Sequence, residues 1–210
     1  MDLETRLLAS VKALFAGESS GHDAAHSIRV YRTAMRIAAQ EPCDREIVTL
    51  ASLLHDADDV KLFRTENFAN ARRIMAECGV ENARAERAIE AIRTASFKGT
   101  DSVVPETIEG KIVQDADRLD AIGAIGVARA FAYGGAKGRA MYDPAVPPEM
   151  DMDEARYRSH EGTTVNHFYE KLFLLRERMN TAAAREIAAR REAFMRAFLE
   201  EFYAEWEGER

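Results

Sequence analysis

Apolar residues recur at three- and four-residue intervals along almost all of the 210 residues, and no other sequence feature restricts the fold as strongly. This spacing places apolar side chains on one face of a helix, whereas a half-buried strand would need strict alternation. Proline and glycine, which interrupt helices, are confined to a few places. The sequence therefore predicts an all-α fold in a single domain, residues 1–210, because a chain of this length can bury one sizeable core.

The boundaries of the predicted helices follow from proline, glycine and capping residues. The predicted helices cover residues 3–15, 23–40 and 44–56, a segment from an N-cap at Thr65 to Gly79, a segment around 85–92, a long region from Pro105 through the run AIGAIGVARA, and residues 164–178 and 181–205. In the last helix, Ile187, Phe194, Phe198 and Phe202 are predicted to share one face. We expect this face and Trp206 to form core or subunit contacts.

Residues 134–161 differ from the rest, because the segment GGAKGRAMYDPAVPPEMDMDE concentrates proline and glycine. A connection of this length in a compact domain is usually a lid, a binding loop or a disordered segment. This long loop separates a predicted core, residues 20–135, from two C-terminal helices within 164–205 that we expect to pack on the core.

Charge and composition exclude several classes of function. The formal net charge is −7, and an acidic chain repels phosphate backbones, so we expect no binding to a nucleic-acid polymer. The most apolar stretch, residues 121–136, is too short to span a bilayer. Cys43 and Cys78 show no metal or redox spacing, and the N-terminus has no secretory pattern, so we expect a cytoplasmic protein.

A cluster of charge at the end of one apolar helix indicates a metal site. His55 follows the apolar run ASLL and precedes Asp56, and carboxylates in such a buried place need strong partners such as a divalent cation. His26 and Asp117 also lean toward packed helix faces. These four residues, from three helices, form a mixed nitrogen and oxygen donor set that suits transition metals better than calcium. The alternative is that they are ordinary caps and surface charges.

Three spaced blocks then carry a resemblance to a known family. GHDAAHSIRV surrounds His26, LLHDADD contains His55 and Asp56, and VQDADRLDAIGAIG contains Asp117. In this order they resemble the HD superfamily of metal-dependent phosphohydrolases. With the later block VNHFYEKLFLLRERMNT, the chain is similar to a small bacterial branch of HD nucleotide pyrophosphohydrolases.

The resemblance implies an HD-domain helical bundle that binds a metal through His26, His55, Asp56 and Asp117. It implies one divalent metal, with Mn²⁺ preferred and Ni²⁺, Co²⁺, Fe²⁺, Zn²⁺ or Mg²⁺ as alternatives. Asp59, three residues after the dyad aspartate, matches a position where relatives orient or deprotonate the attacking water. The implied reaction is hydrolysis of a (deoxy)nucleoside triphosphate to a monophosphate and pyrophosphate.

Other residues are candidates for contacts to the substrate phosphates, because a phosphate chain requires cations or hydrogen-bond donors around its oxygens. These candidates are His22, Lys61, Lys98, Arg118, His167 and Lys171, and each could instead be a surface, capping or packing residue. Asp120 could orient a metal ligand or pair with an arginine.

Several alternatives remain open at this point. The long loop, with Lys137 and Tyr142, could close over a nucleotide or act as the arm of a homodimer. The same metal site could serve a phosphomonoesterase or phosphodiesterase. A non-catalytic module that senses a nucleotide is a further alternative.

Overall fold

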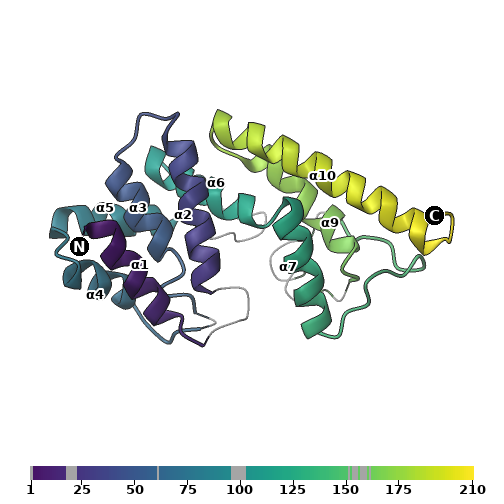
Figure 1. The fold of residues 1–210 in the computed structure, drawn as a ribbon, viewed down its shortest axis with the longest axis horizontal. Coiled ribbons are helices and arrows are strands. Elements are labelled where there is room, and N and C mark those ends of the chain that lie inside the picture. The colour runs from purple at the N-terminus through teal and green to yellow at the C-terminus, as the bar shows by residue number, and fades with distance from the viewer. Residues whose placement is uncertain are drawn as a thin grey trace. The chain divides into compact units, whose positions relative to one another are not determined.

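The computed structural model describes residues 2–17, 23–60, 62–95, 103–150, 152, 156, 160 and 162–210. The helices are α1 (Leu3–Leu14), α2 (Ala24–Ala38), α3 (Arg45–Leu54), α4 (Ala69–Glu77), α5 (Asn82–Arg93), α6 (Ile108–Asp120), α7 (Gly123–Ala136), α9 (Asn166–Glu170), the 3₁₀ helix η2 (Leu172–Arg178) and α10 (Ala182–Trp206) (Figure 1). These residues contain no strand. The all-α prediction is confirmed.

The described residues form two compact units. The first holds residues up to 95 together with 103–117, and the second holds residues from 118 onward. Helix α6 therefore contributes to the first unit as far as Asp117 and to the second from Arg118. The single-domain organisation stays a prediction.

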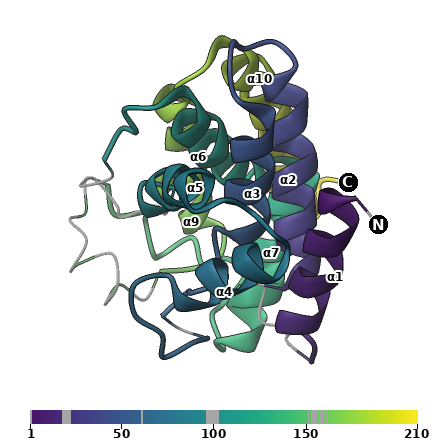
Figure 2. The same cartoon turned by 90° about the vertical axis from the view of Figure 1, so that its left-hand side faces the viewer.

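Helix α3 is the centre of the first unit. Every residue from Ile47 to Leu54 is buried, which is typical of a helix that is covered on all sides. Helices α1, α2 and α5 pack against it (Figure 2). Leu7 and Ile89 are among the side chains that join its residues in one apolar core, so the end of α3 is held firmly inside the unit.

Aromatic side chains form much of the core of the second unit. The ring of Phe131 in α7 lies 6.1 Å from Phe168 and 5.8 Å from Phe198, measured between centroids. Tyr142, in the long loop, packs edge-on against Tyr203 and Trp206 at 5.2 and 5.3 Å. The loop is thereby anchored to the last helix by its tyrosine.

Four predicted boundaries are wrong. The long helical region from Pro105 divides into α6 and α7, because Ile122 is extended, with a φ of −126° and a ψ of 165°, and Gly123 adopts a φ of +78°. Helix α7 continues to Ala136, so the loop begins later than residue 134. Thr65 does not cap α4, which begins at Ala69. The segment 164–178 is a short α-helix followed by a 3₁₀ helix, with Lys171 outside helical geometry between them.

The predicted face of the last helix also needs correction. Phe194 is 48% exposed, whereas Met195 and Leu199 are buried. One residue along a helix corresponds to about 100° of rotation, so a face centred on Met195 turns Phe194 away from the core. Asp120 forms an ion pair with Arg129, as one of the two interpretations of this residue expected.

None of the helices in the described part of the chain combines the length and the apolar character that crossing a membrane requires.

Close packing at Gly134 gives a testable prediction. A Cβ added at Gly134 would lie 2.2 Å from Thr164 Oγ1, whereas one added at Gly135 would meet no atom within 4 Å. We expect Gly134→Ala to lower the free energy of unfolding by about 1–3 kcal/mol through overpacking. Gly135→Ala, the matched control, should be neutral or stabilise the helix by up to about 1 kcal/mol. Thermal and urea unfolding of both variants measure this, and equal stabilities would contradict the packing.

Candidate metal centre

Helix α2 begins with a capped turn that carries His26. The backbone N–H of His26 donates a hydrogen bond of 2.7 Å to Asp23 Oδ1, which satisfies one of the amides left without a partner in the first turn of a helix. His26 is only 2% exposed. The cap therefore fixes the turn that presents this imidazole to the interior.

His55 and Asp56 directly follow the buried helix α3. Nδ1 of His55 lies 2.9 Å from the carbonyl oxygen of Ser52. Because a carbonyl can only accept a hydrogen bond, Nδ1 carries the proton. The neutral ring then keeps its lone pair at Nε2, which is the arrangement of a metal-binding histidine whose other nitrogen donates to a carbonyl.

Donor atoms from three separated parts of the first unit meet at this point. The Nε2 atoms of His26 and His55 are 3.1 Å apart. His26 Nε2 lies 3.4 Å from Asp56 Oδ2 and 3.4 Å from Asp117 Oδ1. His55 Nε2 lies 3.5 Å from Asp56 Oδ1 and 3.9 Å from Asp117 Oδ1. The two imidazoles are thus flanked by two carboxylates.

These separations fit the coordination shell of one cation. Two donor atoms each about 2.1 Å from a shared metal lie roughly 3.0 Å apart at a right angle and about 3.4 Å apart at the tetrahedral angle. Apart from the 3.9 Å pair, the separations above run from 3.1 to 3.5 Å. The donor atoms of His26, His55 and Asp117 lie within 4.8 Å of one another, and this group could hold a metal ion. Asp56 supplies a further carboxylate beside it.

The electrostatics of Asp117 favour the form that binds metal. Burial opposes ionisation, but a hydrogen bond from His26 and the positive charge that the imidazoles of His55 and His26 carry when they are protonated outweigh it, so the pKa of Asp117 is held below its usual value. The carboxylate is therefore ionised at neutral pH, as metal coordination requires.

Comparison with known proteins assigns the family. The HD domain model matches residues 23–122, a span that contains all four of these residues. The uncharacterized protein YpgQ of Bacillus subtilis is 40% identical over 193 residues, covering 90% of this chain and 86% of YpgQ. The chain belongs to the HD superfamily. The pair His55-Asp56, predicted from the sequence to be the HD dyad, is called the HD dyad below.

Solved structures of relatives agree with the HD assignment. An HD-superfamily hydrolase from Bacillus thuringiensis has a TM-score of 0.78 and 39% identity, covering 98% of this chain and 97% of that one. A crystal structure of YpgQ in complex with ADP has a TM-score of 0.78 and 36% identity, covering 98% of both chains. The expected HD-domain helical fold is thereby confirmed.

A clamp that the sequence did not reveal holds the residues after the HD dyad. Asp58 Oδ1 accepts a hydrogen bond of 2.9 Å from the backbone N–H of Asn70, and Oδ2 accepts one of 3.0 Å from that of Ala71. The side-chain amide of Asn70 returns a bond of 2.9 Å to the carbonyl oxygen of Ala57. Asp58 therefore performs the capping predicted for Thr65, and ties the dyad to the start of α4.

Asp59 lies in the turn that the HD dyad begins. Its backbone N–H donates to the carbonyl oxygen of Asp56 at 3.1 Å, and its own carbonyl oxygen accepts from Phe63 at 2.8 Å. This turn keeps Asp59 close to the dyad in the chain. Its part in activating water stays a prediction.

The predicted substrate-binding residues fall into two groups. His22, Lys61 and Lys98 lie outside the described residues. Arg118, His167 and Lys171 belong to the second unit. The guanidinium of Arg118 donates to the carbonyl oxygen of Arg178, within the second unit. Substrate binding by these residues stays a prediction.

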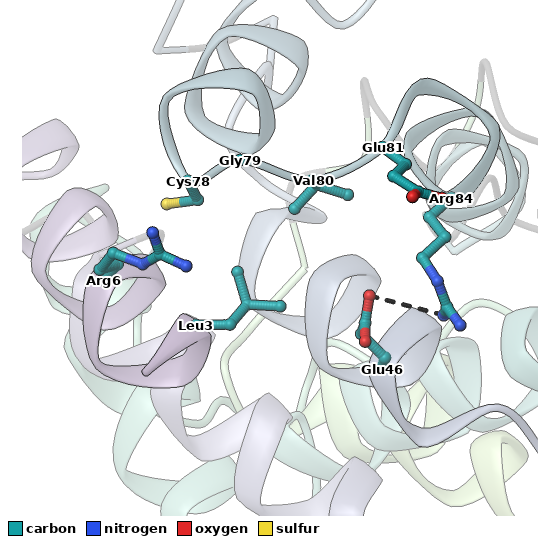
Figure 3. A pocket seen from close by; sticks show the side chains of 8 residues that line it. All are labelled: Leu3, Arg6, Glu46, Cys78, Gly79, Val80, Glu81 and Arg84. Carbon is teal, nitrogen blue, oxygen red and sulfur yellow. Dashed lines mark ion pairs between the residues drawn. The ribbon is translucent and has the colours of Figure 1, made fainter. Parts of the chain in front are cut away.

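A hollow of about 420 Å³ lies elsewhere in the first unit (Figure 3). It is lined by Leu3, Arg6, Glu46, Cys78, Gly79, Val80, Glu81 and Arg84. Two of the lining residues, Arg84 and Glu46, form an ion pair of 3.5 Å. None of the four residues of the candidate metal centre lines this hollow, so the two are distinct.

The Asp58 clamp gives a prediction about metal affinity. We expect Asp58→Ala to lower the free energy of unfolding by about 1–2 kcal/mol, because a helix cap is lost, and to weaken Mn²⁺ binding roughly 10-fold, because support of the ligands is lost. Asp2→Ala is the matched control, since Asp2 also caps a helix by accepting from the N–H of Thr5 at 2.8 Å. Calorimetric titration should find unchanged Mn²⁺ affinity in the control. Equal affinities in the two variants would contradict the role of the clamp.

The environment of His167 predicts a dependence of stability on pH. Burial, together with the charges of Lys171 and Arg139, lowers the pKa of His167 from 6.5 to about 3. Between about pH 3 and pH 6.5 the unfolded chain binds a proton at His167 that the folded chain does not. The contribution of the neutral imidazole to the free energy of unfolding is therefore complete above about pH 6.5 and is lost as the pH falls. At pH 5 the loss is about 2 kcal/mol relative to pH 8.

His167→Gln removes this titration. The difference in unfolding free energy between pH 8 and pH 5, measured by urea unfolding, should shrink by about 2 kcal/mol in the variant. An unchanged difference would show that His167 titrates normally.

Proposed function

We propose that this chain is a metal-dependent hydrolase of nucleoside phosphates, which converts a (deoxy)nucleoside triphosphate to a monophosphate and pyrophosphate. The observation that carries the proposal is the spacing of 3.1–3.9 Å among the imidazole and carboxylate donors of the candidate metal centre. The nucleotide is supported by the ADP complex of YpgQ, a relative that is similar over 98% of this chain.

His26, His55, Asp56 and Asp117 would hold one divalent cation. Two imidazoles and two carboxylates suit Mn²⁺ and its transition-metal neighbours better than Mg²⁺ or Ca²⁺, and we prefer Mn²⁺. A cation bound there would lower the pKa of a water ligand toward neutrality and polarise a phosphoryl oxygen. Four protein ligands leave positions for water and substrate on a six-coordinate ion.

The residues of the chain then prepare the reaction. The proton on Nδ1 of His55, donated to Ser52, keeps Nε2 as the metal-facing nitrogen. Asp59 accepts the proton of the attacking water. The water oxygen forms a bond to the α-phosphorus, the bond from that phosphorus to the bridging oxygen breaks, and pyrophosphate leaves with the electron pair. Asp59 finally returns the proton to solvent.

The products of the reaction test the bond that is cleaved. The purified chain with Mn²⁺ and each dNTP should release pyrophosphate and the deoxynucleoside monophosphate in equal amounts, resolved by ion-exchange chromatography. Orthophosphate without pyrophosphate, in a preparation shown to lack pyrophosphatase, would reject the proposal in favour of a phosphomonoesterase.

The HD dyad is tested by Asp56→Ala. We expect turnover to fall by at least about 10³-fold, since the metal supplies several kcal/mol of transition-state stabilisation, while the helical circular dichroism is retained. Glu77→Gln is the control, because Glu77 is a carboxylate paired with Arg73 on the exposed surface of the same unit. A wild-type chain that binds nucleotide with Mn²⁺ but never turns it over would instead indicate a sensor.

A further inference from the structure

Helix α6 carries Asp117, one of the four residues of the candidate metal centre, in its last two turns. Asp117 is the last residue of the first unit and Arg118 belongs to the second, but α6 continues without a break to Asp120. Successive residues of a helix are related by a fixed rotation of about 100° and a rise of about 1.5 Å. A contact that restrains the last residues of α6 therefore also restrains the direction of the Asp117 side chain.

Three contacts within the second unit hold the last residues of α6. The guanidinium of Arg118 donates to a carbonyl oxygen at the end of η2. The carboxylate of Asp120 is paired with Arg129 of α7. The guanidinium of Arg191, in α10, donates to the carbonyl oxygen of Leu119. Three different elements thus grip the three residues that directly follow Asp117.

The contact of Arg191 differs from the other two because it reaches the backbone of α6. The carbonyl oxygen of Leu119 also accepts from the N–H of Ile122 at 3.2 Å, and a carbonyl oxygen has two lone pairs, so the guanidinium takes the second. The carboxyl end of a helix carries partial negative charge, which a nearby cation stabilises. Arg191 therefore caps α6 both by its hydrogen bond and by its charge.

Gly123 makes room for the side chain of Arg191. A Cβ added at Gly123 would lie 2.9 Å from Cγ of Arg191 and 3.1 Å from its Cβ and Cδ. These atoms form the stem of the side chain, so they cannot move aside without moving the guanidinium away from Leu119. The same break in the chain that ends α6 thus admits the arginine that caps it.

We propose that Arg191 is a positioning residue for the metal centre. By capping α6 it fixes Asp117, whose Oδ1 lies 3.4 Å from Nε2 of His26. A residue of α10 thereby supports a donor set that belongs entirely to the first unit. The binding of a metal by Asp117 rests on the proposed function, whereas the restraint of α6 does not.

Substitution of Arg191 tests this role through metal affinity. Arg191→Met keeps the apolar stem and removes the guanidinium, so we expect calorimetric titration to show Mn²⁺ binding at least about 10-fold weaker than in the wild type. Arg191→Lys should be weakened by only about 3-fold, because an ammonium donates to a carbonyl oxygen but lacks the fork of arginine.

Arg196→Met is the matched control on the same helix. Arg196 is paired with Glu192 at 2.7 Å and lies 4.3 Å from the ring centre of Phe173, and neither partner belongs to α6. This variant also loses guanidinium contacts in the second unit, but it should bind Mn²⁺ as the wild type does. Thermal unfolding checks that each variant is folded.

Two further measurements separate positioning from a general loss of stability. The visible absorption of bound Co²⁺, which depends on the arrangement of its ligands, should change in Arg191→Met and not in Arg196→Met. Hydrogen exchange without metal should be at least about 10-fold faster at the amides of the last turn of α6 in Arg191→Met alone, because local opening governs exchange there.

The inference is overturned if folded Arg191→Met keeps the Mn²⁺ affinity of the wild type, or if Arg196→Met loses as much affinity. If Arg191→Met does not fold, Arg191→Lys decides, and an unchanged affinity in that variant overturns the inference.

Turnover separates this inference from the proposed function. If the wild type hydrolyses dNTPs and Arg191→Met binds Mn²⁺ as the wild type does, the inference fails and the proposed function stands. If the wild type binds Mn²⁺ but hydrolyses no nucleotide, and Arg191→Met weakens the binding, the inference stands and the proposed function fails. A wild type that binds no Mn²⁺ contradicts both.

Discussion

Two imidazoles and two carboxylates that meet in the interior of the first unit impose the main constraint on this protein. The Nε2 atoms of His26 and His55 lie 3.1 Å apart, with carboxylate oxygens 3.4–3.5 Å from them. Buried carboxylates are costly unless their charge is compensated. A divalent cation compensates it more completely than a single shared proton can, because it offers a bond to each donor.

The surrounding structure holds these four side chains together. His26 sits in a helical turn fixed by Asp23, and His55 ends a helix that is buried along its length. Asn67 and Phe68 both have positive φ, 53° and 56°, a conformation that costs on the order of 1 kcal/mol or more for such residues. This turn brings α4 back so that its first amides donate to Asp58, and these hydrogen bonds offset the cost of the turn and link the dyad to α4.

Much of the fold was predictable because it is encoded locally. The apolar spacing of a helix such as α3 and the glycine or proline that ends it lie within a few residues of each other. The meeting of His26, His55, Asp56 and Asp117 was predictable for a different reason, since a charged pair such as His55-Asp56 directly after a buried apolar run requires a compensating partner. That these residues bind a metal stays a prediction. The capping role of Asp58 was missed because its partner Asn70 lies 12 residues away, and no local motif joins them.

The same limit accounts for the break between α6 and α7 at Ile122 and Gly123. Gly123 is followed by a sequence that still favours helix, but it has a positive φ, and Arg191 of α10 packs so closely on it that an added Cβ would lie 2.9 Å from that side chain. Tertiary contacts of this kind override local propensity, and they are absent from any window of the sequence.

The most direct test of the central claim is the anomalous scattering of a crystal grown with Mn²⁺. One manganese peak should lie about 2.0–2.4 Å from Nε2 of His26, Nε2 of His55 and carboxylate oxygens of Asp56 and Asp117. A map with no peak among these four side chains at saturating Mn²⁺, with the two imidazoles still in direct contact, would contradict the account.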